Sequence, residues 1–339
     1  MKLIKTEDAV GHVLCHDMTQ IIKDKYKDAR FRKGHVVTEE DIPVLLSMGK
    51  EHLYVWEMTP GMVHENDAAE RLLALCGQEN MIRSEVKEGK IELKAACDGV
   101  FLVDSSRLIA VNSQDEVMIA TRKGGTAVRE GDKLAGMRVI PLIIEEEKLR
   151  KAEQAAGDKP LLSLKPYVRK TACIVATGGE VKKGLIKDTF TPVVIDKLKT
   201  YGIETLEVVY SGDGVENVRD AVLAMREKKP DMILCTGGMS VDPDDNTPGG
   251  IKAAGANIIA YGAPVLPGAM FLLGYFDDGM PVMGLPGCVM YAGATVFDLV
   301  LPKIAADVPV TRADLAALGE GGLCLGCKPC HYPICPFGK

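Results

Sequence analysis

The chain has 339 residues, of which 47% are hydrophobic and 26% charged, an ordinary composition for a globular protein of two or three domains. Its net charge of −6 excludes a generally basic surface for nucleic acid, so an anionic ligand would have to be held locally. No apolar run approaches a membrane span, and residues 1–8 lack the apolar core of a signal peptide, so we expect a cytoplasmic protein with no membrane partner.

The first part of the chain predicts two small β-rich α+β modules, over residues 1–60 and 61–145. In the first, apolar residues at helical spacing predict a helix from Glu39 to about Met48. In the second, a helix precedes short apolar runs separated by glycines, which predict strands, Leu108–Val111 among them. Residues 116–139 have the pattern of a small β-barrel.

A charged helix and the breaker Gly157-Asp158-Lys159-Pro160 predict a helical linker over residues 146–166. Residues 167–306 then alternate apolar strands with amphipathic helices. This alternation predicts an α/β domain with a doubly wound, mostly parallel sheet.

Three glycine-rich loops in this domain each follow a predicted strand. They are Thr177-Gly178-Gly179-Glu180, Thr236-Gly237-Gly238-Met239-Ser240 and Leu285-Pro286-Gly287-Cys288. The carboxyl ends of parallel strands share one edge, so all three loops can converge on one ligand. Glycine lets the main chain approach an anion closely, and the short helix predicted after the second loop favours phosphate.

Carboxylates follow the second loop at Asp242, Asp244 and Asp245. Their oxygens suggest a divalent metal beside the phosphate. The alternative is a solvated acidic turn, because Asp, Asn, Gly and Pro all form turns.

With these loops, residues of about 170–304 resemble the molybdopterin-binding domain of molybdopterin molybdotransferases and molybdopterin adenylyltransferases. In those families the loops have the sequences Thr-Gly-Asp-Glu, Thr/Ser-Gly-Gly before an Asp-rich turn, and Leu-Pro-Gly. The run Asp245-Asn246-Thr247-Pro248 is similar to the Asp-x-Thr-Pro ending of the adenylyltransferases. The resemblance implies molybdenum cofactor biosynthesis, with molybdopterin or its adenylylated form as the ligand, Mg²⁺ as a cofactor and a homo-oligomeric protein.

The resemblance also implies roles for particular residues. Asp245 and Asp242 are the expected catalytic residues, and Asp245 with Asp242 or Asp244 would hold Mg²⁺. The expected ligand contacts are Thr177, Gly178, Gly179, Glu180, Thr236, Gly237, Gly238, Ser240, Pro286 and Gly287.

The chain also departs from the family pattern. Gly179 replaces the usual Asp, and Leu266 and Ala269 stand where molybdotransferases have the lysines of a Lys-Pro-Gly-Lys element. The N-terminal half lacks their Ser-x-Met-Asp-Gly-Tyr-Ala stretch. The first hypothesis is a molybdotransferase-like transferase that takes part in molybdate insertion. The alternatives are a non-catalytic carrier that delivers the cofactor to molybdoenzyme apoproteins, and a nucleotide-binding regulator.

Four cysteines, Cys324, Cys327, Cys330 and Cys335, have the spacing C-x₂-C-x₂-C-x₄-C-P after a glycine-rich hinge at 319–322. We expect residues 319–339 to form a metal-binding tail. The spacing resembles the bacterial iron–sulfur run with one extra residue, and a zinc site that includes His331 is a further possibility. A disordered, redox-labile tail is the third alternative. The six other cysteines are scattered, which is typical of small buried hydrophobes in a reducing compartment.

Overall fold

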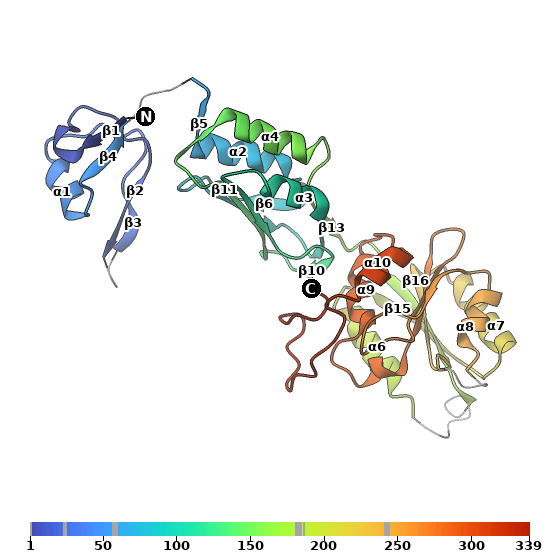
Figure 1. Cartoon of the computed structure of the whole chain (residues 1–339). Helices are drawn as coiled ribbons and strands as arrows, with labels where there is room; N and C mark the ends of the chain where they lie inside the picture. Colours follow the sequence, from blue (N-terminus) through green and yellow to red (C-terminus); the bar gives the residue numbers. More distant parts are fainter. Residues whose placement is uncertain (1, 23–25, 56–59, 180–184, 186, 241–244) are drawn as a thin grey trace. The chain divides into compact units, whose positions relative to one another are not determined.

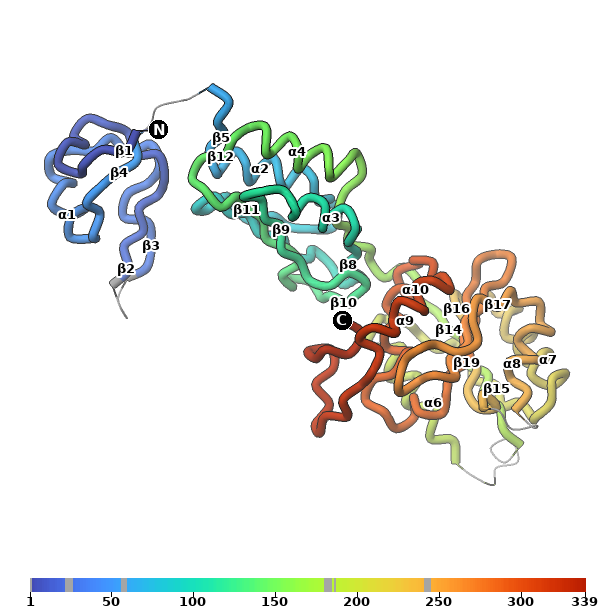
Figure 2. The backbone as a smooth tube through the Cα atoms, viewed as in Figure 1, coloured from blue at the N-terminus to red at the C-terminus, as the bar shows by residue number. Residues whose placement is uncertain are grey.

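The structure, a computed structural model, describes the chain except residues 1, 23–25, 56–59, 180–184, 186 and 241–244 (Figures 1 and 2). It divides into two compact units. Unit 1 comprises Met1–Ala96, Val103–Gly124 and Gly131–Ser163, and unit 2 comprises Cys97–Leu102, Gly125–Glu130 and Leu164–Lys339. Within the described ranges, no helix has both the length and the apolar character needed to cross a membrane.

Unit 1 begins with two small antiparallel pairs, β1 with β4 and β2 with β3, beside the helix α1. Their bounds are β1 Lys2–Lys5, η1 Thr6–Asp8, β2 Met18–Ile22, β3 Tyr26–Phe31, α1 Asp41–Ser47 and β4 His52–Val55. Buried side chains from this part of the chain, including Leu14, Leu45 and Leu53, form one hydrophobic cluster.

The rest of unit 1 is a four-stranded sheet in the order β6-β7-β11-β9, with the helices α2, α3 and α4 packed against it (Figure 1). The bounds are β5 Met62–His64, α2 Glu65–Leu75, β6 Met81–Arg83, β7 Ile91–Ala95, α3 Ser105–Asn112, β9 Val117–Thr121, β11 Lys133–Val139, β12 Ile143–Glu145 and α4 Glu146–Ala156. The expected barrel over residues 116–139 is therefore an open sheet.

Two further expectations in unit 1 need correction. Leu108–Val111 lies in the helix α3, because the Asp104 side chain accepts a hydrogen bond from the Arg107 amide (3.1 Å) and caps a helix start. The helix expected in the linker is α4, and its Leu149, Ala152 and Ala156 are buried. It is thus a structural helix of unit 1 rather than a connection.

Unit 2 is built on a six-stranded sheet in the order β15-β14-β16-β19-β18-β17. Its strands are β14 Thr171–Thr177, β15 Glu204–Ser211, β16 Met232–Thr236, β17 Asn257–Tyr261, β18 Leu272–Tyr275 and β19 Pro281–Leu285. Four neighbouring strands pair in parallel, and β18 is antiparallel to both of its neighbours. The predicted mostly parallel sheet is confirmed.

Both faces of this sheet are covered by helices, because its central strands carry buried side chains on both faces. In β14, Cys173 and Val175 join one core cluster with α7 and α8, whereas Ala172 and Ile174 join a second with α6 and α9. The helices are α6 Phe190–Lys199, α7 Val215–Glu227, α8 Thr247–Ala253, α9 Val296–Ala305 and α10 Arg312–Ala317, with the turn η2 Gly287–Met290. This is the doubly wound arrangement that the sequence predicts.

Unit 2 also takes two strands from earlier in the chain. A three-stranded sheet has the order β10-β8-β13, with β8 at Gly99–Val103, β10 at Thr126–Val128 and β13 at Leu162–Pro166. The Tyr167 hydroxyl donates to the Gly99 carbonyl (2.8 Å). Unit 2 is therefore discontinuous in sequence.

The glycines at 319–322 do not form a hinge. Leu266 N–H donates to the Gly322 carbonyl (2.8 Å), and Gly338 N–H donates to the Gly321 carbonyl (2.9 Å). A Cβ atom at Gly322 would lie 2.3 Å from the Leu318 carbonyl oxygen, so this close packing requires glycine. Phe337 is buried in the core of unit 2, which makes residues 319–339 an integral part of that unit.

Candidate functional site

The three glycine-rich loops leave the carboxyl ends of β14, β16 and β19, which are neighbours in the sheet. Ala176 pairs with Thr236, and Thr236 pairs with Leu285, so the three strands end in register. The loops therefore lie side by side at one edge, where open α/β sheets bind ligands.

Two buried hydroxyls connect the first loop to the second loop and to α8. The Thr177 Oγ1 donates to the Thr236 carbonyl (3.0 Å), the Thr247 Oγ1 donates to the Gly237 carbonyl (2.9 Å), and the two hydroxyls lie 3.1 Å apart. Each hydroxyl has one proton, so only two of these three contacts are made at once. Thr177, expected to contact ligand, is directed into the protein.

Glycine is required in the second loop by close packing as well as by conformation. Gly237 and Gly238 have positive φ angles of 83° and 57°. A Cβ atom at Gly237 would lie 2.3 Å from the Thr177 carbonyl oxygen, and one at Gly238 would lie 2.6 Å from Thr247 Oγ1. These two glycines therefore keep the first and second loops together.

Asp245 closes the second loop onto itself. Its Oδ2 accepts a hydrogen bond from the Ser240 amide (2.9 Å), and Ser240 is exposed. Asp242, Asp244 and Glu180, which the sequence also singles out, lie outside the described residues. The helix that follows, α8, has only seven residues, and its Thr247 amide donates to the Gly238 carbonyl (3.1 Å). The expected role of this helix end in binding phosphate is thus not supported.

Two residues at this edge were not predicted from the sequence. The Tyr261 hydroxyl, at the end of β17, donates to the Met239 carbonyl (2.9 Å). Burial, and then the negative charge of Asp245, raise the pKa of Tyr261. No motif marks this tyrosine, because it becomes a neighbour of the second loop only through the sheet order.

The second unpredicted residue is Asp213, which follows β15. Its Oδ2 accepts a hydrogen bond from the Gly179 amide (3.0 Å). A Cβ atom at Gly179 would lie 2.7 Å from the same oxygen. A carboxylate thus lies beside the position where the family has Asp in the first loop, but it comes from the neighbouring strand.

The expected ligand contacts differ in exposure. Thr177, Thr236 and Pro286 are buried. The others that the structure describes are partly or fully exposed: Gly178, Gly179, Gly237, Gly238, Ser240 and Gly287. A Cβ atom at Gly287 would meet nothing within 4 Å, so a ligand has room to approach the third loop.

The segment that carries lysines in molybdotransferases is used here for another contact. Leu266 forms a parallel bridge with Leu323, and its carbonyl accepts from the Cys324 amide (2.8 Å). The main chain at Leu266 therefore anchors the start of the cysteine segment, residues 324–335.

The cysteine segment lines one side of a cavity of about 430 Å³. Its four cysteines and His331 line this cavity together with Pro267 and residues 291–294. All four thiols are free, and Cys327 and Cys330 are exposed. Among the residues that the structure describes, no three Cys, His, Asp or Glu side chains are grouped as the ligands of a single metal ion.

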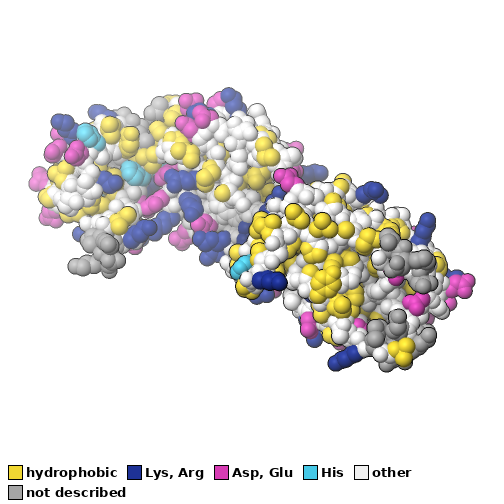
Figure 3. Space-filling model, turned by 60° about the horizontal axis from the view of Figure 1, so that its bottom comes forward, with side chains coloured by type: hydrophobic (Ala, Val, Ile, Leu, Met, Phe, Trp, Pro, Cys, Tyr) yellow, Lys and Arg dark blue, Asp and Glu magenta, His cyan; other side chains and the backbone are white. Residues whose placement is uncertain are grey.

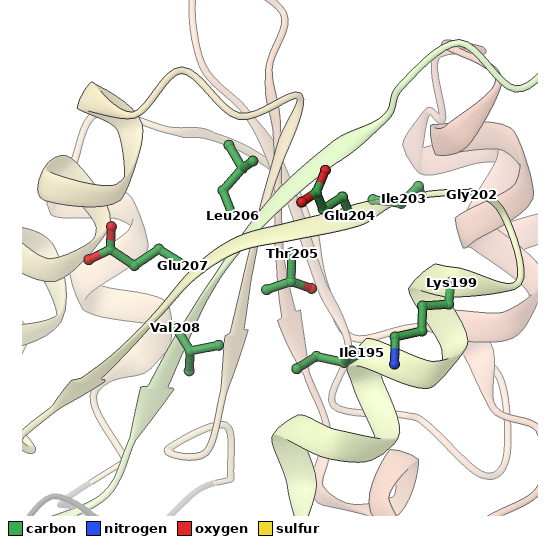
Figure 4. A pocket seen from close by; sticks show the side chains of 9 residues that line it. All are labelled: Ile195, Lys199, Gly202, Ile203, Glu204, Thr205, Leu206, Glu207 and Val208. Carbon is green, nitrogen blue, oxygen red and sulfur yellow. The ribbon is translucent and has the colours of Figure 1, made fainter.

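A second hollow, of about 600 Å³, lies along the outer strand β15 (Figure 4). Figure 4 shows Thr205 and Val208 on the side of Ile195 and Lys199 of α6, with Leu206 on the other side. Residues 204–208 form the first part of β15, whereas the glycine loops lie at the strand ends. This hollow is therefore separate from the candidate site.

Comparison with known proteins identifies the domain that carries the three loops. Residues 173–306 match the family model described as "Probable molybdopterin binding domain". Unit 2 contains a molybdopterin-binding family domain. It is a domain of the molybdenum cofactor biosynthesis type, and the predicted resemblance is confirmed. Residues 3–57 match a family described as a domain of unknown function.

Individual relatives are more distant. A CinA-like protein of Mycobacterium tuberculosis (strain ATCC 25177 / H37Ra) is 33% identical over 76 residues, 22% of this chain and 18% of the relative's length. The match thus spans under one fifth of that protein. A solved CinA structure from Thermoplasma acidophilum has 18% identity and a TM-score of 0.34, covering 40% of this chain and 98% of that one. The molybdopterin biosynthesis enzyme MoaB from Thermus thermophilus has 16% identity and a TM-score of 0.36, covering 42% and 98%.

Proposed function

We propose that this protein acts in molybdenum cofactor biosynthesis by binding molybdopterin, or its adenylylated form, at the edge formed by the three loops. The observation that carries the proposal is the in-register ending of β14, β16 and β19 in a domain of this family. Ser240 presents its hydroxyl and Gly287 its main chain there at exposed positions. Such groups suit the phosphate and the polar pterin edge.

Mg²⁺ fits the acidic character of the second loop. A phosphate beside Asp245 and Asp213 requires positive charge, and carboxylate oxygens are the usual protein ligands of Mg²⁺. In this proposal Asp245, with Asp242 or Asp244, holds the ion, which supplies charge neutralisation at the phosphate. Asp213 holds the first loop through the Gly179 amide.

The transferase form of the proposal is that the protein takes part in molybdate insertion. The test incubates the full chain with adenylylated molybdopterin, molybdate and Mg²⁺ and measures molybdenum bound to the pterin. Asp245→Asn should lower turnover at least tenfold, because it removes a metal-binding charge while an oxygen acceptor for the Ser240 amide remains. The control is Asp196→Asn, an exposed α6 residue paired with Lys199 (3.2 Å). Equal turnover in wild type and Asp245→Asn would refute the catalytic assignment.

One observation favours the second candidate, a carrier without turnover. Leu266 contributes no cation, and its main chain is occupied by the cysteine segment. A carrier would bind molybdopterin in a titration, show no molybdate insertion, and transfer bound cofactor to a molybdoenzyme apoprotein. Absence of both molybdopterin binding and turnover would contradict both candidates.

A further inference from the structure

The cysteine segment is anchored to unit 2 at both ends. At its start, Cys324 N–H donates to the Leu266 carbonyl. Near its end, the Tyr332 hydroxyl donates to the Asp298 carbonyl (3.0 Å), and its ring meets that of the buried Phe337 edge-on at 6.3 Å. These contacts anchor the segment as a loop, and all four of its cysteines line one cavity.

The walls of the cavity come from two parts of the molecule. One wall is the cysteine segment, and the other is Pro267 with residues 291–294, which follow the third glycine loop and the turn η2. Exposed apolar side chains, Tyr291 and Leu325, also line it. Figure 3 shows hydrophobic side chains gathered on the face of unit 2 turned to the viewer.

The two kinds of metal site that the spacing allows differ in the room that they need between the thiolates. A single zinc ion with four thiolates brings the sulfur atoms to about 3.8 Å from one another, in contact, and leaves no cavity between them. A [4Fe–4S] cluster also takes four thiolates, but its iron and sulfide core lies between them. The four cysteines line one cavity of about 430 Å³, which has room for such a core.

Gly293 gives the clearest sign that the wall is shaped for a thiol. A Cβ atom at this position would lie 2.8 Å from Cys330 Sγ and 2.9 Å from Cys330 Cβ. Any side chain at residue 293 would therefore displace Cys330. This contact joins the third cysteine of the segment to the wall that follows the third glycine loop.

The charges around the cavity also suit a cluster. Four thiolates make a [4Fe–4S] centre anionic, and Lys328 lines the same cavity. The Pro336 that follows Cys335 also lines it, as the proline of the bacterial iron–sulfur run follows its last cysteine.

We propose that Cys324, Cys327, Cys330 and Cys335 hold one [4Fe–4S] cluster, seated against residues 291–294 of the molybdopterin-binding family domain. All four cysteines line a single cavity, so the segment itself supplies four candidate ligands. The cluster binds beside the chain that leaves the third glycine loop, and this places an iron–sulfur centre on the pterin-binding unit itself. The inference does not depend on molybdopterin binding.

The test uses the full chain, purified without oxygen and reconstituted with ferrous iron and sulfide. We expect about four iron atoms and about four acid-labile sulfides per chain, with the visible absorbance and reduced-state electron paramagnetic resonance signal of a [4Fe–4S] centre. About one zinc ion per chain and no sulfide would overturn the proposal in favour of zinc. Failure to take up either metal would overturn the site altogether.

Variants test which residues hold the cluster. Cys327→Ser and Cys330→Ser alter exposed side chains, so the fold should survive and the cluster content should fall at least twofold. Gly293→Ala should also lower it at least twofold, because the new methyl group displaces Cys330. The control is Cys97→Ser, a partly exposed cysteine outside the cavity, which should keep full content.

Circular dichroism of the metal-free variants separates cluster loss from unfolding. Full cluster content in a Cys327→Ser, Cys330→Ser double variant would contradict the ligand assignment.

Discussion

Gly237 and Gly287 lie at the ends of neighbouring strands, but the space around them differs. A Cβ atom at Gly237 would lie 2.3 Å from a carbonyl oxygen, whereas one at Gly287 would meet nothing within 4 Å. The first glycine is therefore needed to build the edge, and the second leaves it open for a ligand.

This contrast predicts opposite behaviour of two alanine variants. Gly237→Ala should destabilise unit 2 by about 2–4 kcal/mol, because it combines a positive φ angle with a steric clash. Gly287→Ala should leave stability within about 0.5 kcal/mol of wild type and weaken molybdopterin binding. Urea unfolding measures the first effect and ligand titration the second. Unchanged affinity in Gly287→Ala would argue against a ligand at the third loop.

At the scale of residues, the motifs mark three loops that lie together at one edge, whereas the ligand contacts of single residues stay predictions. Thr177 was predicted as a ligand contact, and in the structure its hydroxyl bonds within the protein. Asp213 and Tyr261 were not predicted, because each reaches the edge from another strand and lies in no motif. Side-chain direction and the order of strands in the sheet determine these contacts, and neither can be predicted from the spacing of residues within a motif.

The start of β14 shows how one side chain aligns two secondary-structure elements. Asp231, just before β16, accepts hydrogen bonds at Oδ2 from Lys170 N–H (2.6 Å), Thr171 N–H (2.8 Å) and Thr171 Oγ1 (2.9 Å). Burial raises the pKa of Asp231, but these donors and the charge of Arg169 outweigh it and lower the pKa overall. The carboxylate thereby sets the register of the central strands at the end opposite to the candidate site.

Asp231→Asn should lower the free energy of unfolding by about 1–3 kcal/mol at pH 7, because it removes a charged acceptor from three donors. The folded-state pKa is depressed, so this stabilisation is present above the unfolded-state pKa and is lost as the pH falls through the folded-state pKa. The gap between variant and wild type in urea unfolding should therefore narrow in acid. A gap that stays constant down to about pH 2 would contradict this account. The exposed Asp196→Asn serves as the control, with little effect expected.

At the scale of elements, the buried strands and amphipathic helices of unit 2 were predictable. The sequence predicts a helix over Phe190–Tyr201, and α6 spans Phe190–Lys199. The expectation of a strand at Leu108–Val111 was wrong. Short apolar runs suit either a strand or a helix, and here the capping contact of Asp104 favours the helix.

For the whole molecule, the main difference from expectation is the interleaving of the two units. Residues 97–102 and 125–130 belong to unit 2 although unit 1 surrounds them in sequence. A helix breaker such as Gly157–Pro160 predicts a domain boundary in the sequence. A strand that pairs with residues far along the chain leaves no such local signal. The α/β class of unit 2 was predictable from the alternation of strands and helices in the sequence. The full set of residues that belong to unit 2 was not.

This interleaving predicts that a change early in the chain will destabilise the later domain. A Cβ atom at Gly99 would lie 2.3 Å from the Lys165 carbonyl oxygen, so Gly99→Ala should weaken unit 2 by about 2–4 kcal/mol. Hydrogen exchange should become faster in peptides of β14 and β16 and stay unchanged in β7. The control, Gly136→Ala in β11, has its nearest neighbour at 3.7 Å and should alter neither. Faster exchange in β7 alone would assign residues 97–102 to unit 1.

The pairing of Leu266 with the cysteine segment uses main-chain atoms alone, and its side chain is 57% exposed. Residue 266 can thus anchor the cysteine segment with its main chain while its side chain is free to be a cation. The neutral side chain at 266 is therefore not imposed by the fold, and an engineered chain with lysine at this position would keep the main-chain contacts that anchor the cysteine segment.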